Sequence, residues 1–226
     1  MSPVPHHLFR DRAHAGRILA HALESSRSFR PVVVALARGG LPVAREVAHH
    51  LGAPLDVLVA QALGVPGGRA PLAAFADGGG VFLDHAIWSL PPAQRDWLDA
   101  AALALVSELS EAGRIARAGR PLPPFEGRRV ILVDDGLLDG LAMAAAADTA
   151  RRRGARAIIG AAPVASAEAI ARLQPLLDEV VCAATLAPLE SVAHCYRDYH
   201  PVTHLEAQAL RSSAEAEQEL LQTAGP

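Results

Sequence analysis

The chain has 226 residues, of which 51% are hydrophobic and 20% are charged, and its formal net charge is −3. This length is enough for one domain with a substantial core. The charge balance gives no reason to expect a nucleic-acid partner. All 21 basic residues are arginine, which excludes Schiff-base catalysis, a P-loop lysine and a lysine general base.

The compartment is predicted from what the sequence lacks. Two cysteines, Cys182 and Cys195, are too few for a disulfide framework. Residues 1–7 contain no apolar signal region, and no uncharged apolar run is long enough to span a bilayer. We therefore expect a cytoplasmic protein that does not associate with a membrane.

The first quarter of the chain alternates helix and strand signals. Residues 9–24 have the spacing of an amphipathic helix, whose apolar face would suit a homodimer contact. The β-branched run 32–37 predicts a strand that is buried on both faces. Pro42 suits the first turn of a helix that continues to Leu51, and residues 55–60 predict a second strand.

Residues 64–80 are rich in glycine and proline and poor in large apolar side chains. This composition predicts a long mobile loop with a short hairpin near its end. Such a loop is either a lid over a binding site or a plain surface connection, and both interpretations stay open.

The remaining chain again alternates between the two element types. We expect helices over 91–118, 140–153 and 166–176, and strands over 130–134, 157–164 and 179–184. This order predicts an α/β fold with a doubly wound parallel sheet. The domain would cover residues 8–211, with flexible tails over 1–7 and 212–226.

Two strand ends carry unusual polar residues, and ligands of such sheets bind where strands end. Arg38-Gly39-Gly40 could point N–H groups at an anion in a backbone nest, with the helix from Pro42 adding its positive end, or could be a simple turn. Asp134-Asp135-Gly136 places two carboxylates together, and water, a metal or ligand hydroxyls could satisfy them. Alternatively, the two carboxylates only reflect the preference for negative charge at the N-terminus of the next helix.

Five segments together resemble the type I phosphoribosyltransferase family, in particular its bacterial stand-alone branch. They are FRDR (9–12), ARGGLPVAREVAHHLGAPLDVL (37–58), VILVDDG (130–136), PVASAEAIARL (163–173) and YRDY (196–199). The resemblance extends from about Phe9 to Leu210.

The resemblance implies transfer of ribose 5-phosphate from phosphoribosyl pyrophosphate (PRPP) to a nitrogen acceptor. The pyrophosphate loop would be Arg38-Gly39-Gly40, and the catalytic carboxylates Asp134 and Asp135 would hold the ribose hydroxyls. Mg²⁺ would arrive on the pyrophosphate, without a metal site on the protein. Residues 64–80 would form the lid, and a C-terminal hood over 185–211 would contact the acceptor.

The 5′-phosphate loop departs from the family pattern DDG-x-x-TGAT. Here the run is DDGLLDGLAM, so Asp139 and Ala142 replace two threonines around Gly140. The implied substrate contacts are Gly136, Asp139, Gly140, Leu141 and Ala142. A carboxylate about 4 Å from a doubly charged phosphate is repelled by roughly 8 kcal/mol at an effective dielectric constant of 20. Asp139 could also simply cap the following helix.

The pyrophosphate end departs as well, because Gln61-Ala62 stands where the family often has a basic pair. The hypotheses are a phosphoribosyltransferase with impaired 5′-phosphate binding, a non-catalytic descendant that binds a ligand or a partner chain, and a transferase whose sugar donor lacks the 5′-phosphate. In each case we expect a small sugar-phosphate or nucleotide-like ligand. The spacing of His194, Cys195, His200 and His204 fits no familiar zinc site.

Overall fold

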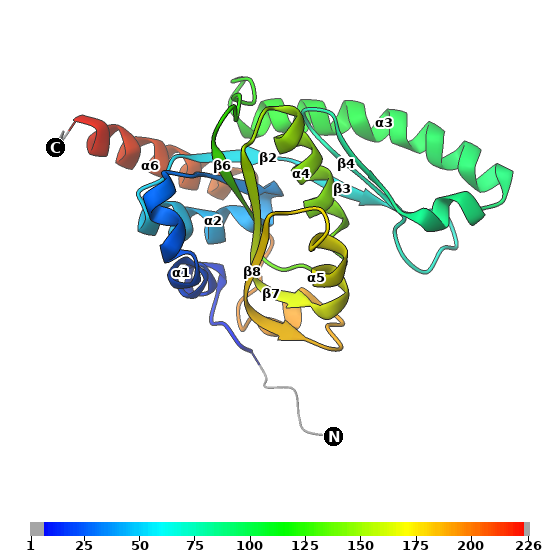
Figure 1. Ribbon diagram of the computed structural model, residues 1–226, viewed down its shortest axis with the longest axis horizontal. Coiled ribbons are helices and arrows are strands. Elements are labelled where there is room, and N and C mark those ends of the chain that lie inside the picture. The colour runs from blue at the N-terminus through cyan, green and yellow to red at the C-terminus, as the bar shows by residue number, and fades with distance from the viewer. Residues whose placement is uncertain (1–6, 224–226) are drawn as a thin grey trace.

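The structure is a computed structural model that describes residues 7–223. Its centre is a parallel five-stranded sheet with the order β2-β1-β6-β7-β8, which confirms the predicted α/β fold (Figure 1). The strands are β1 (Val32–Leu36), β2 (Leu55–Leu58), β6 (Arg129–Val133), β7 (Ala157–Ser166) and β8 (Glu179–Leu186). The chain winds outward in both directions from β1 and β6, so the topological switch point lies between these two strands.

Helices cover both faces of the sheet, which explains why β1 is buried along its whole length (Figure 1). Val34 and Leu36 face the core beneath α4, whereas Val33 and Ala35 face the core beneath α1 and α2. The helices on these faces are α1 (Arg12–Ala22), α2 (Ala37–Leu51), α4 (Leu141–Arg152) and α5 (Ala167–Leu173).

The apolar face of α1 is used within this chain. Ala15, Leu19 and Leu23 are almost completely buried, and a Cβ added to Gly16 would lie 2.8 Å from the carbonyl of Val43 in α2. Of the predicted helix 9–24, the part after Ala22 is a 3-10 helix, η1 (Glu24–Phe29). Much of the face that we expected to suit a homodimer contact therefore packs within the chain, while Ile18 on it remains 38% exposed.

A second sheet corrects the prediction of a long loop over 64–80, although the short hairpin expected near the end of this segment is present over residues 73–83. It is antiparallel, with the order β3-β4-β5, and β4 is fully buried between α3 and α4. The irregular part shrinks to 64–72 and the turn 77–79. The elements of this region are β3 (Ala60–Leu63), β4 (Ala73–Ala76), β5 (Gly80–Leu83), η2 (His85–Ser89) and α3 (Pro92–Ala116).

The C-terminal segment also differs from the prediction of a frayed tail. After η3 (Val192–Cys195), helix α6 (His204–Thr223) packs on α2. Glu217 of α6 pairs with Arg45 at 2.6 Å and with His49 at 3.1 Å, and these contacts fix the helix to the domain. The rest of the predicted tails, residues 1–6 and 224–226, lies outside the described residues.

No helix within residues 7–223 is both long and apolar enough to cross a membrane.

Candidate functional site

The acidic pair follows β6 directly, at the switch point of the sheet. Asp135 is buried, and one of its carboxylate oxygens, Oδ2, accepts hydrogen bonds from Arg12 Nε at 2.8 Å and from the Tyr199 hydroxyl at 2.9 Å. The FRDR, VILVDDG and YRDY segments therefore meet in one cluster around this carboxylate.

Arg12 is held on several sides. Its Nη1 donates to the carbonyl of His200 at 2.8 Å, and its guanidinium lies 3.8 Å from the centroid of the Tyr199 ring. Burial alone would lower the pKa of Arg12, but the hydrogen bond and the charge of Asp135 outweigh it, so this pKa is raised. The result is a buried ion pair, with side-chain exposures of 8% for Arg12 and 10% for Asp135.

Two tyrosines of the hood complete this cluster. The Tyr196 hydroxyl donates to the backbone carbonyl of Asp135 at 2.5 Å. The pKa of Tyr196 and that of Tyr199 are both raised, mainly by burial and then by the charge of Asp135. Both hydroxyls therefore remain protonated donors at neutral pH.

Asp134 has a different environment. Its Oδ1 accepts the backbone N–H of Asp135 at 2.9 Å, and the side chain is partly exposed. Its pKa is raised well above the usual range, first by burial and second by repulsion from Asp135. Of the two residues, Asp134 is the less buried.

The glycines after β1 do not form the predicted nest. Arg38, Gly39 and Gly40 belong to the first turn of α2, which starts at Ala37 rather than at Pro42, and neither glycine has a positive φ. Pro42 only removes the N–H that would bond to the carbonyl of Arg38. The glycines instead permit close packing, because an added Cβ at Gly39 would lie 2.7 Å from Asp135 Oδ2, and one at Gly40 would lie 2.6 Å from the carbonyl of Val133.

The loop before α4 is held by side chains from the end of β7 and from α5. Ser166 donates its hydroxyl to the carbonyl of Leu138 at 2.7 Å, and Arg172 donates to the carbonyl of Asp139. The Asp139 Oδ1 accepts the N–H of Leu141 at 2.9 Å, while Gly140 has a φ of 76°. The N-cap residue of α4 is Gly140 rather than Asp139, but the Asp139 carboxylate still occupies the first amide of the helix, that of Leu141.

The structure brings most of the sequence-predicted site residues to this edge of the sheet. Gly136 lies beneath the hood, since an added Cβ would be 2.5 Å from Cγ1 of Val192. Leu141 and Ala142 open α4. Arg38 is exposed, and its guanidinium has no hydrogen-bond or ion-pair partner among the described residues.

The sequence reasoning missed the partners of Asp135. FRDR and YRDY were recognised only as family segments, and no role followed for Arg12, Tyr196 or Tyr199. The available signal was that both segments contain Arg-Asp flanked by an aromatic residue, Phe9 in the first and Tyr196 in the second. Within residues 7–223, no three His, Cys, Asp or Glu side chains are placed to hold a metal together.

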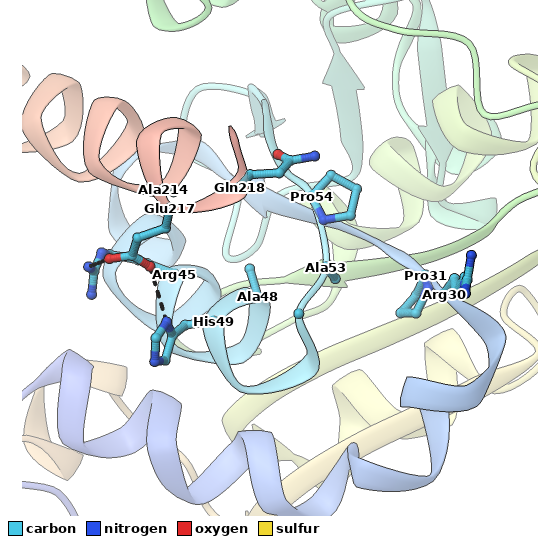
Figure 2. A pocket seen from close by; sticks show the side chains of 11 residues that line it. Arg30, Pro31, Arg45, Ala48, His49, Ala53, Pro54, Ala214, Glu217 and Gln218 are labelled. Atoms are coloured by element: carbon cyan, nitrogen blue, oxygen red, sulfur yellow. Dashed lines mark hydrogen bonds and ion pairs between the residues drawn. The ribbon is translucent and has the colours of Figure 1, made fainter. Parts of the chain in front are cut away.

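A separate pocket of about 360 Å³ lies beside the Arg45–Glu217–His49 contacts (Figure 2). Pro31 and Pro54, which line it, directly precede β1 and β2. The pocket is therefore at the amino ends of the strands, away from the acidic pair.

The doubly wound sheet with an acidic pair at its switch point defines a phosphoribosyltransferase-like α/β domain. No family model matches the sequence. The protein TT1426 from Thermus thermophilus has a crystal structure that is 36% identical, with a TM-score of 0.76, covering 91% of this chain and 98% of that one.

Two curated proteins from two strains of Mycobacterium tuberculosis, each named "Putative phosphoribosyl transferase", are 39% identical over 216 residues, or 92% of this chain and 47% of theirs. The chain spans about half the length of these curated relatives. With these similarities and this fold, the chain belongs to the phosphoribosyltransferase-like family.

Proposed function

We propose that this protein is a phosphoribosyltransferase-like domain in which transfer of ribose 5-phosphate from PRPP to a nitrogen acceptor is impaired at 5′-phosphate binding. One observation carries the proposal: the Asp139 carboxylate accepts the Leu141 N–H at the N-terminus of α4. In the family pattern, this loop grips the phosphate.

The competition between Asp139 and a phosphate has two parts. The phosphate would need the amide that the carboxylate already occupies. It would also meet a like charge, and each pair of unit charges 4 Å apart costs about 4 kcal/mol at an effective dielectric constant of 20. Half of the resulting repulsion for a doubly charged phosphate lowers affinity by about a thousandfold.

The acidic pair supports the same proposal. In an active transferase, Asp134 and Asp135 would orient the ribose and stabilise positive charge at the anomeric carbon. Here the charge of Asp135 is offset by Arg12, which leaves Asp134 as the carboxyl group able to contact a sugar hydroxyl. Mg²⁺ would have to arrive with the pyrophosphate and be held largely by pyrophosphate oxygens.

The Arg12–Asp135 pair also favours a second candidate, a non-catalytic descendant that binds a small sugar-phosphate or nucleotide-like ligand at this edge. A third candidate is a transferase whose donor carries a hydroxyl instead of the 5′-phosphate, because Asp139 could accept that hydroxyl. Pyrophosphate release in the presence of candidate acceptors separates the enzymes from the non-catalytic descendant.

The binding step is tested by calorimetry with PRPP and Mg²⁺ on four forms of the chain. The parent should show no binding in the micromolar range. Asp139→Asn keeps the acceptor oxygen but removes the charge, and it should bind weakly. Asp139→Thr with Ala142→Thr should bind most tightly, because it restores both hydroxyl groups.

Asp148→Asn is the matched control, since Asp148 is another carboxylate of α4 that bonds to Arg152 outside the loop. It should bind no better than the parent. Micromolar binding by the parent, with no gain from the double substitution, would show that Asp139 does not close the phosphate subsite.

A further inference from the structure

A cavity of about 570 Å³ lies beside the first turn of α2, between α3 and α6. Its floor includes Val57 and Val59, at the carboxyl end of β2. The cavity shares no lining residue with the segment Asp134–Ala142. Its volume is typical of a small-molecule site.

One side of the cavity is apolar. Leu105 and Leu109 of α3 present buried side chains to it, together with Val57. Ile115, also from α3, lines the cavity and remains 45% exposed. An apolar ligand body would remove this exposed surface from water, which is favourable.

The charges around the cavity suit a single negative charge. Arg38 lines it and has no hydrogen-bond or ion-pair partner in the part of the chain that the structure describes. Arg211 is buried and pairs with Glu215 at 2.6 Å, a carboxylate that Arg120 also contacts. Glu108 adds an exposed carboxylate to the lining.

With one available guanidinium and one nearby carboxylate, the cavity does not offer enough positive charge for pyrophosphate. Arginine binds a carboxylate well, through two parallel N–H donors. We propose that this cavity binds a small organic monoanion with an apolar body, with Arg38 contacting its carboxylate and Leu105, Leu109 and Ile115 contacting its body. Arg38 and Gln61, which both line this cavity, also belong to the pyrophosphate end that the family resemblance implies, so the test includes competition by pyrophosphate.

The probe is 2-naphthoate, compared by calorimetry with its neutral counterpart 2-naphthamide. Saturable 2-naphthoate binding is expected, and 2-naphthamide should bind at least about tenfold more weakly, because hydrogen bonds to charged groups are the stronger ones. Added pyrophosphate should not displace 2-naphthoate. Absence of saturable binding into the millimolar range, equal binding of the amide, or displacement by pyrophosphate would each overturn the proposal.

Two pairs of variants locate the bound probe. Arg38→Gln should weaken 2-naphthoate binding by about tenfold and leave 2-naphthamide binding unchanged, since only the charge-assisted contact is lost. Its control is Arg128→Gln, an exposed arginine directly before the central strand β6, at the amino ends of the strands rather than the carboxyl ends. Arg128→Gln should change neither affinity.

Ile115→Ser should weaken both probes by several fold, because it removes apolar contact area. Its control is Leu103→Ser on the same helix, at a residue that is 78% exposed and does not line the cavity. Circular dichroism verifies that each variant is folded. Unchanged affinity in both Arg38→Gln and Ile115→Ser would place the probe elsewhere and overturn the proposal, whereas PRPP binding by the parent would contradict only the proposed function.

Discussion

The carboxyl ends of β6 and β1 are neighbours at the switch point, yet their charged side chains have opposite situations. Asp135, after β6, is buried and bonded to Arg12 and Tyr199. Arg38, after β1, is exposed and unpaired among the described residues. Position at a strand end therefore does not decide whether a charged group is available to a ligand. Burial and the nearest partner decide it.

The largest expected effect compares the two arginines of these regions. Arg12→Met should lower the free energy of unfolding by about 3–5 kcal/mol, because it leaves the buried Asp135 charge without a partner. Arg38→Met should change it by less than about 0.5 kcal/mol, as is usual for an exposed side chain without contacts. Urea unfolding at pH 7 measures both values.

Arg10→Met provides the intermediate control, since Arg10 forms an exposed ion pair with Asp11 at 2.7 Å. Removing such a pair should cost no more than about 1 kcal/mol. If Arg12→Met were no more destabilising than Arg10→Met, the buried Arg12–Asp135 pair would contribute no more to stability than an exposed ion pair.

A smaller effect separates the two neighbouring carboxyl groups. Because the pKa of Asp134 is raised, the folded state binds more protons than the unfolded state between the ordinary aspartate pKa, about 3.9, and the raised value. Asp134 therefore lowers stability as the pH rises through this window. Asp134→Asn should increase the free energy of unfolding at pH 8 by on the order of 1 kcal/mol, and much less near pH 4.

Asp134→Asn keeps a side-chain oxygen that can accept the Asp135 N–H. Any change in stability therefore reports the charge of Asp134 rather than the loss of this hydrogen bond. Unfolding curves measured from pH 4 to pH 8 give the result. A loss of stability at pH 8 would mean that the charge of Asp134 is compensated in the fold.

The strands of the central sheet could be predicted closely from sequence, because Val32–Leu36 and Arg129–Val133 are dense in β-branched and leucine residues. The bounds of β3 and β4 were not predicted, because AQAL and AAFA are rich in alanine, which is depleted in strands. The start of α2 was misplaced because Gly39 and Gly40 suggest a turn. Gly39 and Gly40 instead lie in the helix, where they pack closely against Asp135 and Val133, two residues that are distant in sequence.

The acidic pair could be placed from sequence, since it follows a buried strand and parallel strands gather their carboxyl ends at one edge. The pairing of Asp135 with Arg12 could not be predicted from sequence, because the two residues are 123 positions apart and no local pattern links them. The position of Asp139 near the start of α4 could be predicted from sequence, and its bond to the Leu141 N–H is local, but the N-cap residue itself, Gly140, was not predicted.

The central claim is that Asp135 serves chiefly as the buried counter-ion of Arg12. A double-mutant cycle with Arg12→Met, Asp135→Asn and the combined variant, measured by urea unfolding, tests it most directly. We expect a coupling free energy of about 2 kcal/mol or more, with the combined variant more stable than the sum of the single losses implies. Single losses that add to within about 0.5 kcal/mol would contradict it.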